Sequence, residues 1–248
     1  NRFKFEVMKP LILFVIAVCA VICPAQEEIT KDYLMGKFQP WKDKRFTVSG
    51  GNYLRKETFE AYQKMQNEAR KNGVNLQIVS ATRTFIEQKR LWENKWTART
   101  PVNTDTGEFL PKPNTLKDSL TKEQRALRIL EFTAMPSASR HHWGTDLDFN
   151  DVNPSYWTSV RGQREYIWLV ENAPRFGFCQ VYSANRQTGY HEEKWHWSYL
   201  PIARNLTNEY QKQIIDSDIT LTEFIGSETA ITTRFIENYV LGINSDCK

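Results

Sequence analysis

The chain has 248 residues and a formal net charge of +4, with 33 Lys and Arg against 29 Asp and Glu. Both signs are interspersed without a long basic run, which argues against a nucleic-acid-binding protein. A hydrophobic content of 40% and an aromatic content of 13% are sufficient for a sizeable core in one globular domain.

The first residues are typical of a secretory signal. A short basic start around Met8 is followed by thirteen apolar residues over 11–23 and then by a polar stretch. Such a run matches a signal-peptide core and is short for a membrane span. We therefore expect residues 1–25 to comprise upstream residues and a signal peptide over about 8–25, which directs a secreted or periplasmic protein with no membrane span after its removal. An uncleaved single-span anchor is the alternative.

Glycine and proline mark a lead-in over 26–53, which we expect to be irregular. After it, apolar residues recur with helical spacing, and cap and stop signals bound the periodic segments. Helices are predicted over 54–71, 85–96, 121–132 and 161–172, with one or two more within 201–240.

The predicted strands are short and separated along the chain. Residues 74–79 alternate apolar and polar side chains, and further extended segments are expected over 146–150 and from 176 onward. Residues 100–118 have the composition of an exposed loop. Helices mixed with such strands predict an α+β fold, in which a small, mainly antiparallel sheet is flanked by helices. One domain over 54–248, ending in a helical extension, would contain them.

Two cysteines, Cys179 and Cys247, remain after signal removal. In an oxidising compartment they could form a disulfide that ties the C-terminal tail to the body. A buried free Cys179 with a frayed terminal Cys247 is the alternative, and the sequence favours neither.

The first of two chemically informative stretches contains His141 and Asp148, seven residues apart. Gly144 allows the backbone to turn between them. Asp148 shares one face of the extended segment with Asp146, because alternate strand residues point the same way. Imidazole and carboxylate are both good zinc donors. Taken alone, the pair could also be a loop histidine and an ion-pair partner.

The second stretch contains His196 between two tryptophans, with Glu193 three residues before it. With His141 and Asp148, it makes three ligands, the number in a catalytic zinc site that leaves one position for water. Glu193 could take a proton from that water. In an ideal strand Glu193 and His196 face opposite sides, so we predict a bulge or bend between them. Alternatively, Glu193 is solvated and His196 is held by aromatic packing.

Three further side chains are candidates for substrate contact. Arg83 follows the first predicted strand, and its guanidinium could stabilise an oxyanion or clamp a substrate carboxylate. Gln88 and Ser139 could hydrogen-bond to a substrate backbone. By position alone, each could equally be a surface or structural residue.

The order Ser139-x-His141-x-x-Gly144-x-x-x-Asp148, then Glu193-x-Trp195-His196-Trp197, resembles the VanY-type zinc D-alanyl-D-alanine carboxypeptidases. That family is related to the D-Ala-D-Ala dipeptidases and the hedgehog amino-terminal domain, and the resemblance covers roughly residues 54–200.

The resemblance implies a role for each candidate residue. Zinc would be held at the sheet by His141, Asp148 and His196, and Glu193 would be the general base. Arg83 would match the family's arginine near the scissile bond, and Gln88 and Ser139 would match substrate contacts. Asp146 departs from the pattern, which often has alanine there. Its carboxylate could orient a zinc ligand, which we favour, hold a cationic substrate group, or form an ion pair.

The implied function is zinc-dependent hydrolysis of a peptide bond in peptidoglycan stem peptides, with release of the terminal D-Ala. The implied partner is the peptide substrate, and we expect a monomer that binds no nucleic acid. An L,D-carboxypeptidase or an endopeptidase on the same scaffold is the first alternative. A non-catalytic cell-wall binding module is the second, although such a module has no need of Glu193.

Overall fold

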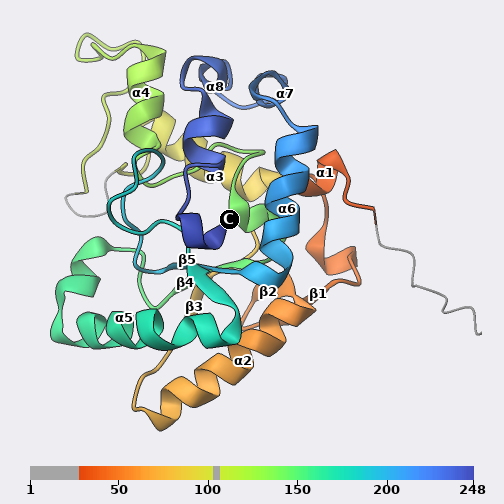
Figure 1. Ribbon diagram of the computed structural model, residues 1–248. Helices are drawn as coiled ribbons and strands as arrows, with labels where there is room; N and C mark the ends of the chain where they lie inside the picture. The colour runs from red at the N-terminus through yellow and green to blue at the C-terminus, as the bar shows by residue number, and fades with distance from the viewer. Residues whose placement is uncertain (1–27, 103–106) are drawn as a thin grey trace, which may run out of the picture.

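The computed structural model describes residues 28–102 and 107–248 (Figure 1). The predicted signal peptide lies outside these residues. Among the helices of the described part, none combines the length and apolar character needed to cross a membrane.

A four-stranded sheet lies at the centre of the molecule. Its order is β3 (Ile78–Ser80), β4 (Asp146–Phe149), β6 (His196–Tyr199) and β5 (Phe178–Gln180), and each neighbouring pair is antiparallel. A separate antiparallel hairpin joins β1 (Phe46–Ser49) to β2 (Asn52–Arg55). The predicted α+β class with a small antiparallel sheet is therefore confirmed.

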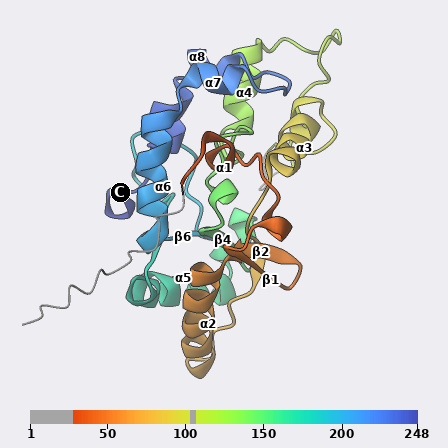
Figure 2. The same ribbon diagram turned by 90° about the vertical axis from the view of Figure 1, so that its right-hand side faces the viewer.

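Two helices, α2 (Lys56–Lys71) and α5 (Val160–Asn172), cover one face of the sheet, in the lower part of Figure 1. They pack on the apolar side chains that alternate strand positions turn towards them, including Leu147 and Phe149 of β4 and Trp197 of β6. The remaining helices lie beyond the other face (Figures 1 and 2). These are α1 (Lys31–Leu34), α3 (Phe85–Trp96), α4 (Lys122–Ile129), α6 (Leu200–Gln213), α7 (Asp216–Thr220) and α8 (Thr229–Thr232). The polar residues of β4 and β6 are thereby buried between the sheet and a second apolar core.

The lead-in expected to be irregular is ordered into short elements. Within 28–53 the chain forms α1, the 3-10 turn η1 (Pro40–Lys42), β1 and part of β2. Tyr33 donates a hydrogen bond to the Trp143 carbonyl, and the Trp143 indole donates one to the Leu34 carbonyl. These contacts span more than 100 residues of sequence, so local composition could not predict them.

Helix positions agree well with the periodicity of the sequence, whereas strand lengths do not. The predicted helices over 54–71, 85–96 and 161–172 correspond to α2, α3 and α5. The helix predicted over 121–132 ends at Ile129. The strand predicted over 74–79 is shorter and begins later, as β3 over Ile78–Ser80. The described part of the predicted loop over 100–118 contains no helix or strand.

The C-terminal segment returns to the edge of the sheet. After α8, a π-helix η5 (Ile236–Val240) and a 3-10 turn η6 (Ser245–Cys247) bring Cys247 to β5, where it forms a disulfide with Cys179. The Asn244 amide also donates to the Val181 carbonyl, extending the backbone contacts of the β5 edge. Of the two alternatives for the cysteines, the structure has the disulfide.

Candidate metal centre

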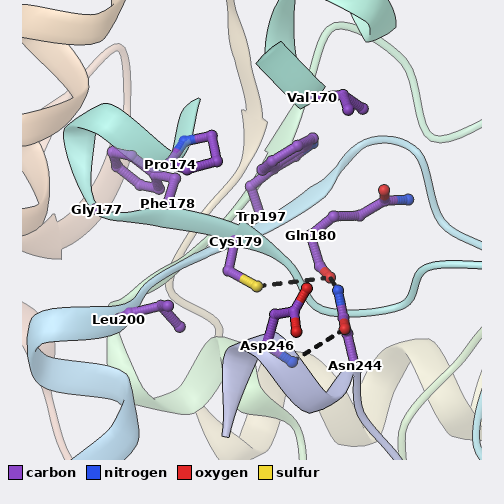
Figure 3. Close-up of a pocket in the computed structure, with 10 residues that line it drawn as sticks. All are labelled: Val170, Pro174, Gly177, Phe178, Cys179, Gln180, Trp197, Leu200, Asn244 and Asp246. Carbon is purple, nitrogen blue, oxygen red and sulfur yellow. Dashed lines mark hydrogen bonds between the residues drawn. The ribbon is translucent and has the colours of Figure 1, made fainter. Parts of the chain in front are cut away.

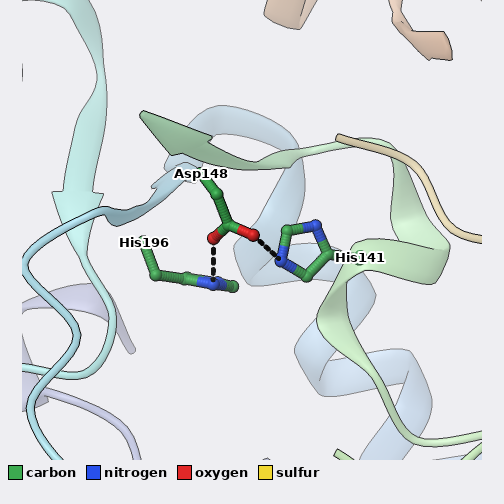
Figure 4. A group of neighbouring side chains, drawn as sticks. All are labelled: His141, Asp148 and His196. Atoms are coloured by element: carbon green, nitrogen blue, oxygen red, sulfur yellow. Dashed lines mark ion pairs between the residues drawn. The ribbon is translucent and has the colours of Figure 1, made fainter. Parts of the chain in front are cut away.

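Three candidate ligands from separate elements meet on the buried face of the sheet (Figure 4). His141 lies in the 3-10 turn η2 (Arg140–Trp143), Asp148 in β4, and His196 at the start of β6. Asp148 and His196 are register partners across the two central strands. The candidate ligand atoms all lie within 4.8 Å of one another. Their exposed fractions are only 2%, 4% and 3%, so the group is almost completely buried.

The contacts within this group leave donor atoms unsatisfied. His141 Nε2 lies 3.3 Å from Asp148 Oδ2, and His196 Nδ1 lies 3.1 Å from Asp148 Oδ1. Neither His141 Nε2 nor Asp148 Oδ1 has a hydrogen-bond partner of acceptable geometry, although both atoms are buried. Buried polar atoms normally find partners, and a bound ion is one explanation for such exceptions where several of them face one another. Two imidazoles and one carboxylate are a donor set that suits zinc.

The protonation of His141 follows from its surroundings. Its Nδ1 lies 2.7 Å from the Ala81 carbonyl oxygen, which can only accept a hydrogen bond. The ring proton is therefore on Nδ1, and the lone pair of Nε2 points towards Asp148.

Glu193 precedes β6 in a tight turn. The His196 amide donates to the Glu193 carbonyl at 3.3 Å, and the Glu193 amide donates to the Tyr182 carbonyl at 2.9 Å. This turn brings Glu193 Oε2 to 3.6 Å from His196 Nδ1. The predicted bend between the two residues is therefore confirmed. Burial raises the pKa of Glu193 to about 8, although His196 opposes the shift.

Arg83 lies in the loop after β3 and is fixed through its backbone. Its amide donates to the His141 carbonyl, and its own carbonyl accepts from His142 Nδ1 at 2.6 Å. The side chain lines the same cleft as Glu193, His141 and His196. Its Nε is buried without a partner, and no ion pair joins Arg83 to another residue in the described part of the chain. A guanidinium in this position is available for an anionic or carbonyl group.

The other two predicted contacts differ from each other. Ser139 is buried and lines the cleft. Gln88 is fully buried and does not line the cleft, and its Nε2 donates to the Ala134 carbonyl at 2.7 Å. Because Ala134 itself lines the cleft, Gln88 supports the wall and does not form it.

Sequence reasoning missed several residues that form the cleft. Tyr182, Tyr190 and Phe132 line it beside the candidate catalytic residues. The Tyr190 hydroxyl is buried without a partner. Its place three residues before Glu193 was the only available signal, since spacing does not reveal which loop aromatics turn inward. The water-accessible volume of the cleft is about 20 Å³, enough for roughly one water molecule.

The remaining histidines, His142 and His191, lie outside the candidate ligand group. His142 is buried against the Arg83 carbonyl, and burial lowers its pKa to about 3. His191 is exposed and stacks edge-on against Phe132.

A larger cavity of about 330 Å³ lies beside β5 and the disulfide (Figure 3). Its walls include Phe178, Trp197 and Leu200, together with Asn244 and Asp246 of the C-terminal segment. None of the predicted catalytic or metal-binding residues lines it. The chemically equipped cleft is therefore the smaller of these two cavities.

Comparison with known proteins agrees with the composition of the cleft. YodJ of Bacillus subtilis, whose name gives it a provisional carboxypeptidase assignment, is 27% identical over 180 residues. A D-alanyl-D-alanine carboxypeptidase of Enterococcus faecalis is 26% identical over 168 residues. These matches cover 69% and 67% of this chain and 53% of each relative. The chain thus spans about half the length of the curated relatives that it matches.

Solved structures give a weaker similarity. VanYB in complex with D-alanine-D-alanine has a TM-score of 0.49 and 24% identity, covering 69% of this chain and 85% of that one. The LD-carboxypeptidase LdcB has a TM-score of 0.48 and 22% identity, covering 72% and 81%. The sequence match is more extensive, because the family model VanY, D-alanyl-D-alanine carboxypeptidase, matches residues 51–202, more than half of the chain. On this match, the chain belongs to the VanY D-alanyl-D-alanine carboxypeptidase family.

Proposed function

We propose that this protein is a zinc-dependent carboxypeptidase that releases the terminal D-Ala from peptidoglycan stem peptides. The observation that carries the proposal is a cleft lined by His141, His196 and Glu193, in which Asp148 contacts both histidines from behind the lining and the Glu193 carboxylate lies 3.6 Å from His196 Nδ1. The names of the D-alanyl-D-alanine carboxypeptidase relatives support the substrate class. Peptidoglycan lies outside the cytoplasmic membrane, which agrees with export by the predicted signal peptide. We further propose that the protein acts as a monomer.

The donor set supports zinc over harder cations. His141, Asp148 and His196 offer two nitrogens and one oxygen, whereas calcium and magnesium prefer oxygen ligands. When bound, the zinc ion supplies a Lewis acid that acidifies water and polarises a carbonyl group.

Glu193 is the proposed general base. It accepts a proton from the attacking water and later returns it to the leaving amine. Burial raises its pKa to about 8, and a nearby dication lowers the pKa again by favouring the carboxylate.

Arg83 is the proposed partner of the substrate oxygen. Its backbone is held by His141 and His142, so the side chain starts from a fixed position at the cleft. Its guanidinium stabilises negative charge that develops on the scissile carbonyl, or holds the terminal carboxylate. The small cleft, walled by Tyr182 and Tyr190, favours a substrate that ends at the site over a chain that runs through it.

The test is hydrolysis of defined muropeptides by the purified protein, read by mass spectrometry. Pentapeptide should lose one D-Ala, a chelator should abolish the reaction, and added zinc should restore it. Tetrapeptide and cross-linked peptide are included, because cleavage of these alone would indicate an L,D-carboxypeptidase or an endopeptidase. A protein that binds cell-wall peptide without cleaving any substrate would be a binding module.

The variant Glu193→Gln tests the role of the base directly. It keeps the shape of the side chain but removes the basic carboxylate, so kcat/KM should fall by about 10²–10⁴ while the zinc content stays unchanged. A zinc-loaded Glu193→Gln protein with full activity would rule out this mechanism.

A further inference from the structure

Asp146 lies beneath the metal centre and is surrounded by hydrogen-bond donors. Its Oδ1 accepts from His196 Nε2 at 2.9 Å and from Arg140 Nε at 3.0 Å. Its Oδ2 accepts from the Thr145 and Ser198 hydroxyls at 2.7 and 3.0 Å. The residue has no exposed surface. Every contact is made to the carboxylate as an acceptor, which is the state of the ionised form.

Arg140 neutralises this carboxylate and is itself fully held. Its Nη1 donates to the Thr207 hydroxyl at 2.9 Å, and its Nη2 donates to the Ser198 hydroxyl at 3.0 Å. The guanidinium also stacks 4.7 Å from the centre of the Trp143 ring, and only 1% of the residue is exposed. The Arg140–Asp146 pair is therefore held in place by contacts with residues of β6, α6 and η2.

This geometry determines which nitrogen of His196 faces the metal centre. An ionised carboxylate can only accept, so the proton of a neutral His196 ring must be on Nε2. The lone pair is then on Nδ1, which lies 3.1 Å from Asp148 Oδ1 and 3.6 Å from Glu193 Oε2. In His141 the assignment is reversed, because the Ala81 carbonyl accepts from Nδ1 and leaves the lone pair on Nε2.

We propose that Asp146, held by Arg140, is a positioning residue that sets the orientation and tautomer of His196 so that Nδ1 binds the metal ion. The inference rests on the zinc site of the proposed function. Hydrogen bonds to the outer nitrogen of a metal-binding histidine typically contribute about 10–100-fold in metal affinity. Arg140 cancels the charge of Asp146, so the site gains this orientation without a second uncompensated negative charge.

Stability alone does not account for the pair. Burying two charges costs desolvation energy, and replacing a buried ion pair with apolar residues of similar volume is often neutral or stabilising. The variant Arg140→Met/Asp146→Ala removes both charges together and leaves neither unpaired. We expect it to fold, and thermal unfolding checks this.

Zinc affinity and the His196 ring are then measured without any peptide substrate. Competition with a chromophoric chelator should give an affinity about 10–100-fold weaker than that of the wild type. Long-range ¹H–¹⁵N spectra of the zinc-loaded wild type should show His196 with its proton on Nε2 and zinc on Nδ1. The double variant should lose this uniform state, while His141 keeps its Nδ1 proton and is the internal reference.

Ser198→Ala is the matched control. It removes one hydroxyl from the same network but leaves the 2.9 Å contact between Asp146 and His196, so zinc affinity should stay close to that of the wild type. A folded double variant with wild-type zinc affinity and an unchanged His196 ring would overturn the proposal. The wild-type spectrum is decisive even if the double variant does not fold, because zinc on Nε2 of His196 would also overturn it. A zinc-loaded wild type that cleaves no muropeptide would refute the proposed function and leave this inference intact.

Discussion

Reducing the Cys179–Cys247 disulfide should lower the free energy of unfolding by about 4 kcal/mol. The bond joins residues 68 positions apart and so closes a long loop in the unfolded chain. In the chain-entropy description, a loop of this size restricts the unfolded state by about 15 cal/mol/K, which is about 4 kcal/mol at 25 °C. For a domain of roughly 150–250 residues, that loss corresponds to a decrease in Tm of about 8–16 °C.

The folded contacts of the tail should survive reduction. The Asn244 amide donates to the Val181 carbonyl, and Arg186 Nη1 donates to the Gly242 carbonyl at 2.7 Å. Cys247 is 1% exposed, so its thiol would stay buried against β5. The loss of stability is therefore expected mainly from the greater freedom of the unfolded chain, with cooperative unfolding retained.

The assay is urea unfolding followed by tryptophan fluorescence, with and without a reductant. The chain has eight tryptophans, so the signal is strong. The variant Cys179→Ala/Cys247→Ala should match the reduced wild type, and reductant should not change the variant further. Coinciding midpoints for the oxidised and reduced wild type, or two titratable thiols in the native protein, would refute the reasoning.

Three other substitutions test the candidate site and the surrounding structure. Arg83→Ala should lower kcat/KM on pentapeptide by about 10²–10³ without loss of zinc, through kcat if Arg83 stabilises the oxyanion and through KM if it holds the terminal carboxylate, and an unchanged kcat/KM would contradict both roles. Burial, together with the charge of Arg83, lowers the pKa of Lys95 from 10.5 to about 8. Between about pH 8 and pH 10.5 the unfolded chain therefore binds more protons than the folded protein. In this range the free energy of unfolding rises with pH. Lys95→Met should therefore be more stable than the wild type by about 3 kcal/mol below pH 8, a gain that disappears above about pH 10.5 in urea titrations; a pH-independent difference would exclude the effect. Gly144→Ala forces a side chain onto a φ of +73° and places a Cβ 2.4 Å from Phe46 Cε1, so thermal unfolding should show a loss of about 2–5 kcal/mol, and an unchanged Tm would show that the turn tolerates a side chain.

Local patterns predicted the helices better than the strands. The α3 helix begins at a capping box formed by Thr84 and Glu87, and its apolar spacing persists to Trp96. By contrast, β3 has only three residues, and its pairing depends on Phe149 and Asp148, about 70 positions later. A strand depends on its partner, so its length cannot be inferred from its own sequence.

The sequence carries less information about candidate substrate contacts than about candidate metal ligands. His141, Asp148 and His196 have side chains whose chemistry limits their possible roles, and all three converge in the structure. Gln88 has many possible roles, and its burial behind Ala134 follows from the packing of α3 against the 130–135 segment. Tyr190 carried no local sign of facing the cleft, because the orientation of a loop aromatic is decided by its neighbours.

The sequence by itself determined the donor set, the candidate base and the need for a bend before His196, because side-chain chemistry and strand alternation are local properties. Only the tertiary structure decided that Cys179 pairs with Cys247, that the lead-in packs on Trp143, and that Asp146 binds the outer nitrogen of His196. Each of these depends on atoms brought together from positions about 50 to 110 residues apart. The sequence shows which residue types are available and how far apart they lie along the chain. Which atoms contact one another depends on how the folded chain packs.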